Sequence, residues 1–136
     1  MAKLVPKIYP NDVNENNPIG VSYPFTVGNV KQNYITTDQI HDNLRNLCLT
    51  MKGERPMQPT FGSDLYHLLF EPINDDILSQ AARKAIREAV NQWMPYIEIV
   101  NVNTTSRRDE HIVIITVQYK VDGWPADNAL NMEVRV

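Results

Sequence analysis

The chain has 136 residues, of which 43% are hydrophobic, enough for one domain with a core. Its formal net charge of −3 lacks the basic excess of a general nucleic-acid binder. No apolar run reaches the roughly 20 residues that span a bilayer, and no apolar signal core opens the chain. We therefore expect neither nucleic acid nor membrane among its partners. Cys48 is the single cysteine and cannot form an internal disulfide, so a cytosolic origin is expected.

Residues 1–20 are expected to form an extended N-terminal arm, and residues 21–136 a single domain. Three prolines interrupt the arm, and an Asn-rich polar tract follows the second of them. The order of such an arm is expected to depend on a partner. Polar and apolar residues then alternate from Tyr23 to Val27, which predicts a short strand. Pro24 lacks an N–H donor and favours an edge position for that strand.

The first helix is predicted to begin at Thr36, because Gln39 follows at capping-box spacing. An apolar stripe continues along it at helical spacing, formed by Ile40, Leu44, Leu47, Cys48 and Met51. Gly53 is expected to cap its C-terminus in the left-handed conformation.

Two further helices are predicted before the strands begin. A short helix over about 64–70 is expected to be capped by Ser63 and stopped by Pro72. A longer helix is expected from the cap Asn74 to Pro95, with a wide apolar face and its charged residues on the opposite side.

Three segments near the C-terminus alternate with strand period, at 96–103, 111–121 and 130–136. Short polar connectors join them, which favours an antiparallel meander. The predicted fold class is α+β, with about three helices packed on a small, mainly antiparallel sheet.

Candidate catalytic and metal-binding groups are few. Ser63, Asp64 and His67 lie close together, whereas a nucleophile triad normally assembles from distant segments, and Ser63 is expected to cap a helix. Asp38, His41 and Asp42 share one helical turn and are more simply explained as a solvated helix start. Cys48 lies on the apolar stripe and is expected to pack in the core. No catalytic residue, metal or cofactor is predicted.

Paired carboxylates deserve separate consideration, since glycosidases use two such groups. Glu54, Asp64 and Glu71 flank the segment from Gly53 to Gly62. Arg55 would keep Glu54 ionised, and an ionised carboxylate is a poor general acid. A structural role is favoured for all three acids. A lysozyme-like enzyme that cleaves peptidoglycan through Glu54 or Glu71 is the alternative.

Two features point to contacts with other proteins. Trp124 lies in a predicted turn, where a core position and an interface position are equally compatible with the sequence. The last strand is expected at a sheet edge, where it could accept a strand from a partner. Its candidate residues for this role alternate along the strand and are Leu130, Met132, Val134 and Val136. The alternative is that the segment from Tyr23 to Val27 covers this edge.

The segment from Gly53 to Gly62 carries glycines at both ends, two prolines and one large aromatic residue, a composition suited to one fixed shape. Glu54 and Arg55 are expected to hold it locally, and Phe61 to enter the core. With the residues that follow, it resembles the signature of the phage baseplate wedge and sheath-initiator family, which has members in T-even phages, P2-like tails and type VI secretion (TssE). The matching residues are Gly53, Glu54, Arg55, Pro59, Phe61, Gly62, Leu65, Phe70, Glu71 and Pro72.

One departure from the family pattern follows the third helix. The family usually has Glu-Pro-Arg there, a motif linked to docking on other wedge proteins, whereas this chain has Met94, Pro95 and Tyr96. The resemblance makes these three residues the wedge-docking candidates, and their apolar and aromatic character implies a docking contact of that kind.

The resemblance also implies a role. Family members are structural parts of the contractile-tail baseplate that bind the wedge proteins and nucleate the sheath by strand exchange. The implied partners are the wedge proteins, the tail sheath protein and also tube or hub proteins. The implied location is the virion tail baseplate, assembled in the host cytoplasm, although a secretion-type injection machine fits equally. Some members are labelled lysozyme-like, a label that the acids of this chain do not support.

Overall fold

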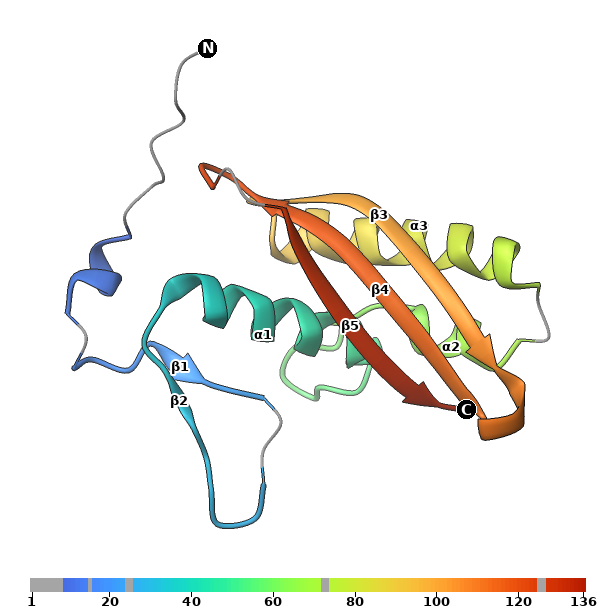
Figure 1. The fold of residues 1–136 in the computed structure, drawn as a ribbon, viewed down its shortest axis with the longest axis horizontal. Helices are drawn as coiled ribbons and strands as arrows, with labels where there is room; N and C mark the ends of the chain where they lie inside the picture. The colour runs from blue at the N-terminus through green and yellow to red at the C-terminus, as the bar shows by residue number, and fades with distance from the viewer. Residues whose placement is uncertain (1–8, 15, 24–25, 72–73, 125–126) are drawn as a thin grey trace.

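The computed structural model describes residues 9–136 apart from 15, 24–25, 72–73 and 125–126. Pro24 and the signature residue Pro72 thus lie outside the described residues. Three helices, α1 (Thr36–Leu49), α2 (Leu65–Leu69) and α3 (Asp75–Trp93), form a layer on one face of a sheet (Figure 1). The sheet consists of β3 (Ile97–Arg107), β4 (Ile112–Val121) and β5 (Asn128–Arg135). The predicted α+β class is confirmed.

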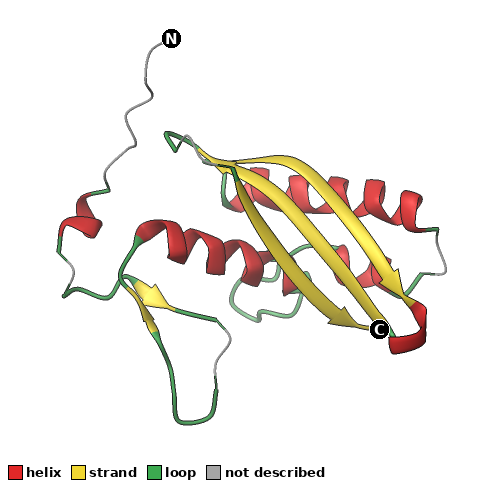
Figure 2. Ribbon diagram, in the orientation of Figure 1, coloured by secondary structure: helices red, strands yellow, loops and turns green. Residues whose placement is uncertain are grey.

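The sheet is an antiparallel meander in the order β3-β4-β5 (Figure 2). Side chains alternate across it, so one face is buried against the helices and the other is exposed. Val113, Ile115 and Val117 of β4 lie on the buried face, as the alternation predicts. Small buried alanines on α3, among them Ala82 and Ala89, let this helix approach β3 closely.

A separate two-stranded sheet lies beside the start of α1. It pairs β1 (Gly20–Val21) with β2 (Gln32–Asn33), and the connecting hairpin projects away from the main sheet (Figure 1). The strand predicted over Tyr23 to Val27 is wrong in its described part. The Asn29 N–H donates to the Thr26 carbonyl at 3.0 Å, and Gly28 takes a φ of +81°, so these residues form a turn.

The start of α1 is held by a residue that the sequence pattern did not reveal. Thr36 is the first helical residue, and its N–H and hydroxyl both donate to Asp12 Oδ1, at 2.8 and 2.6 Å. Gln39 accepts instead from Asn33 Nδ2 at 3.0 Å. The predicted capping box is therefore wrong. A carboxylate is a stronger acceptor than an amide oxygen, and Asp12 of the short 3-10 helix Pro10–Val13 acts as the acceptor for the first N–H of α1.

The start of α3 also differs from the prediction. Asn74 precedes α3 as expected, but its side chain makes no capping hydrogen bond within the described part of the chain. Two aspartates in the first turn of α3 favour the positive end of the helix dipole. Of the helices described, none is long and apolar enough to cross a membrane.

We expect Asp12→Ala to release the start of α1. The loss of a helix-capping acceptor costs about 1 kcal/mol of folding free energy, so the melting temperature should fall and the Thr36 amide should exchange faster. Asp12→Asn is the matched control because it retains an oxygen at the same position. Equal amide exchange in Asp12→Ala and wild-type protein would contradict this account of the cap.

Candidate functional site

The signature segment closes a loop onto the end of α1. The Gly53 N–H donates to the Pro59 carbonyl at 2.7 Å, and the Ser63 N–H donates to the Thr50 carbonyl at 2.9 Å. Met51 and Ser63 form a parallel bridge. These contacts bring the two ends of the segment together and fix the direction in which the chain enters α2.

Two glycines of this loop adopt conformations that other residues rarely take, for different reasons. Gly62 has a φ of +124°, and a Cβ there would lie 2.4 Å from the Thr50 carbonyl oxygen. Gly53 has a φ of +88°, but a Cβ at this residue would extend into open space. The expected left-handed cap at Gly53 is wrong, because α1 ends at Leu49 and Thr50 is extended. Gly53 instead lies in the following turn.

Glu54 and Arg55 hold the loop separately. Glu54 Oε2 accepts from the Met51 N–H at 3.0 Å. The Arg55 guanidinium lies over the Phe61 ring at 4.1 Å, a cation–π contact. Phe61 is half-buried and meets Trp93 edge-on at 5.2 Å between ring centroids. The local fixation expected of this pair thus operates through a backbone amide and an aromatic ring.

The three acids considered for glycoside hydrolysis have different surroundings. Glu54 accepts from the Met51 backbone, and Asp64 forms an ion pair with Lys52 at 2.9 Å. Glu71 is exposed beside a cavity at the start of α3. A carboxyl group that acts as a general acid is usually shielded from solvent, and none of the three is buried.

The other groups considered for chemistry have structural contacts. Ser63 is buried, and its hydroxyl donates to the Cys48 carbonyl at 2.8 Å. The Leu65 N–H donates to Ser63 Oγ at 3.4 Å. Burial raises the pKa of the Cys48 thiol to about 12, so the reactive thiolate is disfavoured. His67, beside this serine in the sequence, is exposed.

The acids and the histidine at the start of α1 are also structural. Asp42 accepts from Asn33 Nδ2 at 2.6 Å, which ties α1 to β2. His41 Nδ1 lies 2.9 Å from the Tyr119 hydroxyl of β4. Burial raises the pKa of Tyr119 to about 12, and the charges of Asp42 and Asp38 act in the same direction. Across the described ranges, no three potential metal ligands gather in one place.

The two edges of the main sheet differ in their protection. On β3, the Thr104 N–H donates to Ser79 Oγ of α3 at 3.2 Å. The register of β3 against β4 shifts between Ile99 and Asn101, and α3 reaches this irregularity. Arg83 donates to the Val100 carbonyl at 2.6 Å, and Arg87 to the Ile99 carbonyl at 3.2 Å. The sequence pattern predicts both arginines on the solvent side of α3, whereas in the structure they cover the edge of β3.

The edge of β5 remains open in the described structure. The Val136 N–H donates to the His111 carbonyl at 2.8 Å. In this register every second residue of β5, counted back from Val136, forms backbone hydrogen bonds with β4. The backbone groups of Asn131, Glu133 and Arg135 therefore point away from β4. The hairpin of β1 and β2 forms its own sheet, and none of its described residues pairs with β5, so the alternative that the segment from Tyr23 to Val27 covers this edge is wrong for the described part of that segment.

The side chains proposed for the strand contact face inward. Leu130, Met132 and Val134 are buried in the core, and Val136 is 41% exposed. An added strand would thus meet the backbone of β5 rather than these side chains.

The wedge-docking candidates differ in their exposure. Met94 is 5% exposed and belongs to the core, whereas Pro95 and Tyr96 are exposed. Trp124 is half-buried and packs against the core, which favours the first of its two interpretations.

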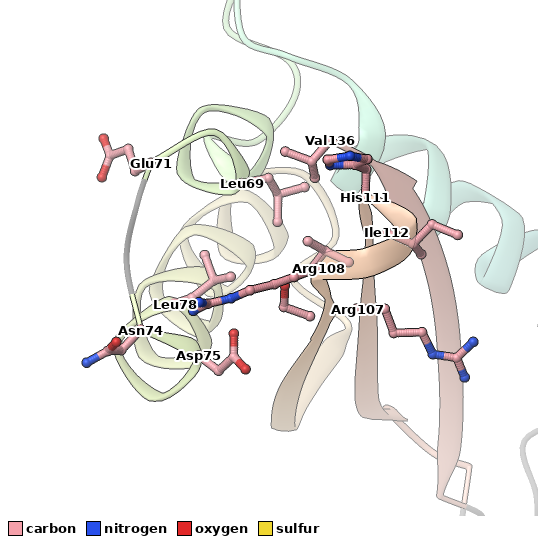
Figure 3. Close-up of a pocket in the computed structure, with 12 residues that line it drawn as sticks. Leu69, Glu71, Asn74, Asp75, Leu78, Arg107, Arg108, His111, Ile112 and Val136 are labelled. Carbon is pink, nitrogen blue, oxygen red and sulfur yellow. The ribbon is translucent and has the colours of Figure 1, made fainter.

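A cavity of about 520 Å³ lies where β5 ends (Figure 3). Leu69, Leu78 and Val136 contribute its apolar lining. Figure 3 shows Arg108 reaching from the β3–β4 connection toward Leu78 and Asp75, whereas Arg107 points away from them. Arg107 Nη1 lies 3.5 Å from Glu110 Oε2. The cavity combines cationic and acidic groups around an apolar floor, and its two acids, Glu71 and Asp75, are exposed.

Comparison with known proteins defines the class. The profile of the family of baseplate wedge protein gp25 matches residues 36–126. Over 88 residues the chain is 31% identical to baseplate wedge protein gp25 of Enterobacteria phage T4, an alignment that covers 65% of this chain and 66% of that protein, just under two thirds of its length. These two matches define the class as that of the baseplate wedge proteins. The chain belongs to the family of baseplate wedge protein gp25, as its signature predicted.

Solved structures share the fold. A candidate tail lysozyme from Geobacter sulfurreducens superposes with a TM-score of 0.66 at 25% identity, covering 75% of this chain and 92% of that one. A chain of the type VI secretion system baseplate complex gives a TM-score of 0.56 at 14% identity, covering 72% and 91%. The second likeness concerns the fold alone.

The two signature glycines give a matched test of the loop. Gly53→Ala should cost about 1–2 kcal/mol, because only the left-handed backbone is strained. Gly62→Ala should cost about 1–3 kcal/mol more, since its Cβ would also collide with the Thr50 carbonyl. Chemical denaturation of both variants measures the difference. Equal losses of stability would contradict a role for Gly62 in close backbone approach.

Proposed function

We propose that this chain binds the wedge proteins of a contractile-tail baseplate and nucleates the sheath by offering the edge of β5 to the first ring of sheath subunits. The observation that carries the proposal is the difference between the two sheet edges. Natural sheets protect edges that would otherwise pair with other chains, and α3 protects β3 in this way. No strand within the described ranges pairs with the outward backbone groups of Asn131, Glu133 and Arg135, which suits strand addition.

Wedge binding is assigned to the surface around Pro95 and Tyr96. Both are exposed at the turn between α3 and β3, and Met94 anchors the turn because its side chain is buried and its N–H donates to the Val90 carbonyl at 2.8 Å. A rigid turn that presents a proline and an aromatic ring loses little conformational entropy on binding. This supports docking through apolar and aromatic contacts.

The remaining parts of the proposal concern place and organisation. The chain would act in the tail baseplate of a virion, after assembly in the host cytoplasm, with tube or hub proteins as further neighbours. Residues 21–136 would form the baseplate domain, and the arm of residues 1–20, which already binds α1 through Asp12, would contact a neighbour. The phage T4 relative, a baseplate wedge protein, supports this setting.

A proline on the open edge tests strand addition. Proline is tolerated on an edge strand where its missing N–H faces outward, so Glu133→Pro should fold yet lose one bond to an added strand. We expect baseplates carrying Glu133→Pro to form few or no extended sheaths in electron micrographs. Glu133→Ala, which keeps the N–H, should form them normally. Thermal melting establishes that both variants are folded, and normal sheaths on Glu133→Pro baseplates would refute the assignment.

We propose that the protein binds its partners and catalyses no reaction, although the Geobacter protein of similar fold is named a candidate tail lysozyme. The purified protein should release no soluble fragments from peptidoglycan, and Glu54→Gln and Glu71→Gln should behave as the wild-type protein does. Lysis that disappears in either variant would establish the lysozyme-like alternative instead.

A further inference from the structure

A groove follows one face of α1 and is formed by two adjoining cavities. The first, of about 410 Å³, has a mostly apolar lining that includes Ile19 and Ile40. The second, of about 250 Å³, contains Arg55 and Phe61. Asn43 and Tyr96 line both cavities, so the two lie side by side along α1. We call this feature the α1 groove. The α1 residues along it recur at helical spacing and are Thr36, Gln39, Ile40, Asn43, Asn46 and Leu47.

The Arg55 end of the groove offers hydrogen-bond donors. Arg55 rests on the Phe61 ring and forms no ion pair with a carboxylate among the residues described. The Asn43 Oδ1 atom accepts from Gln39 Nε2 at 2.8 Å, which leaves the Asn43 amino group to donate outward. No acidic residue lines this cavity. A guanidinium held on an aromatic ring beside an amide donor is complementary to a carboxylate.

The groove is unsuited to a strand. Its lining comes from α1, from Tyr9 and Ile19 of the arm, from the signature loop, from the end of α3 and from two turns, and no residue of β1 to β5 contributes. The backbone of α1 already satisfies its own hydrogen bonds, so the groove has no row of free N–H and C=O groups. An occupant must therefore satisfy its own backbone, as a helix does.

We infer that the α1 groove binds an amphipathic helix of a neighbouring baseplate protein, with an apolar side chain near Ile40 and a carboxylate on Arg55. Ile40 and Leu47 lie seven positions apart on α1, about 10 Å along the helix axis, which matches two turns of the incoming helix. The apolar residue and the acid of the partner should thus be seven positions apart. This inference rests on the wedge-binding half of the proposed function and adds the partner's chemistry.

Charge reversal tests the carboxylate contact. Arg55→Glu should weaken binding of the full chain to its purified wedge assembly by about tenfold or more, because a charge-assisted hydrogen bond is replaced by repulsion. Arg55→Lys should retain most of the affinity. Lys84→Glu makes the same change of charge on the exposed side of α3, outside the groove, and should bind as the wild-type chain does. Unchanged binding of folded Arg55→Glu would overturn the inference.

Cross-linking identifies the occupant and separates this inference from strand addition. A photoreactive phenylalanine analogue is placed at position 43 in one sample of assembled baseplates and at position 131 in another. At position 43 we expect cross-links to an acidic helix of a neighbouring protein. Cross-links to a second copy of this chain, to its own residues 1–8, or to nothing would overturn the groove assignment. Position 131 reports independently on the sheath strand, so either proposal can fail alone.

Discussion

The fold depends on the close approach between Gly62 and the last turn of α1. With no Cβ at residue 62, the loop returns to the Thr50 carbonyl, and Ser63 then binds both that carbonyl and the carbonyl of Cys48. A helix end leaves its last carbonyls without intrahelical partners, and here the signature loop supplies them. Ser63 thereby sets the start of α2, and Leu65 enters the core two residues later. The signature is thus a structural joint between α1 and the helices that follow.

The position of α3 carries this constraint to the sheet. Because the joint places α3 along β3, the side chains of Ser79, Arg83 and Arg87 reach the outer backbone groups of that strand. A three-stranded meander has two edges, and this arrangement covers one of them. Among the residues that the structure describes, no strand pairs with the other edge, at β5. A partner strand meets one available side of the sheet rather than two.

Sequence patterns captured the parts of the fold that depend on local periodicity. The alternation in β4 and β5 and the apolar stripes of α1 and α3 were sufficient to place most of the core. Contacts between distant segments were not predictable in this way. Asp12 lies 24 residues before Thr36, and its carboxylate replaced the expected local cap. Arg83 and Arg87 are charged residues at helical spacing, and only the fold shows that they bind carbonyl groups of a strand. The wedge-docking candidates show the same limit, because Met94 continues the inner face of α3 through its bond to Val90 while its two neighbours are exposed.

The surfaces proposed for binding rest on different physical interactions. The outer face of the sheet carries exposed polar side chains such as Gln118, Lys120 and Glu133 beside the partly exposed Ile112 and Ile114. Recognition at the edge of β5 would use the outward backbone groups of that strand, and hydrogen bonds between such neutral groups depend little on ionic strength. The α1 groove relies on the charge of the half-buried Arg55, and salt screens the attraction between charged groups. Rising ionic strength should thus weaken the groove contact before the strand contact, so the two attachments of this protein could be loosened one at a time.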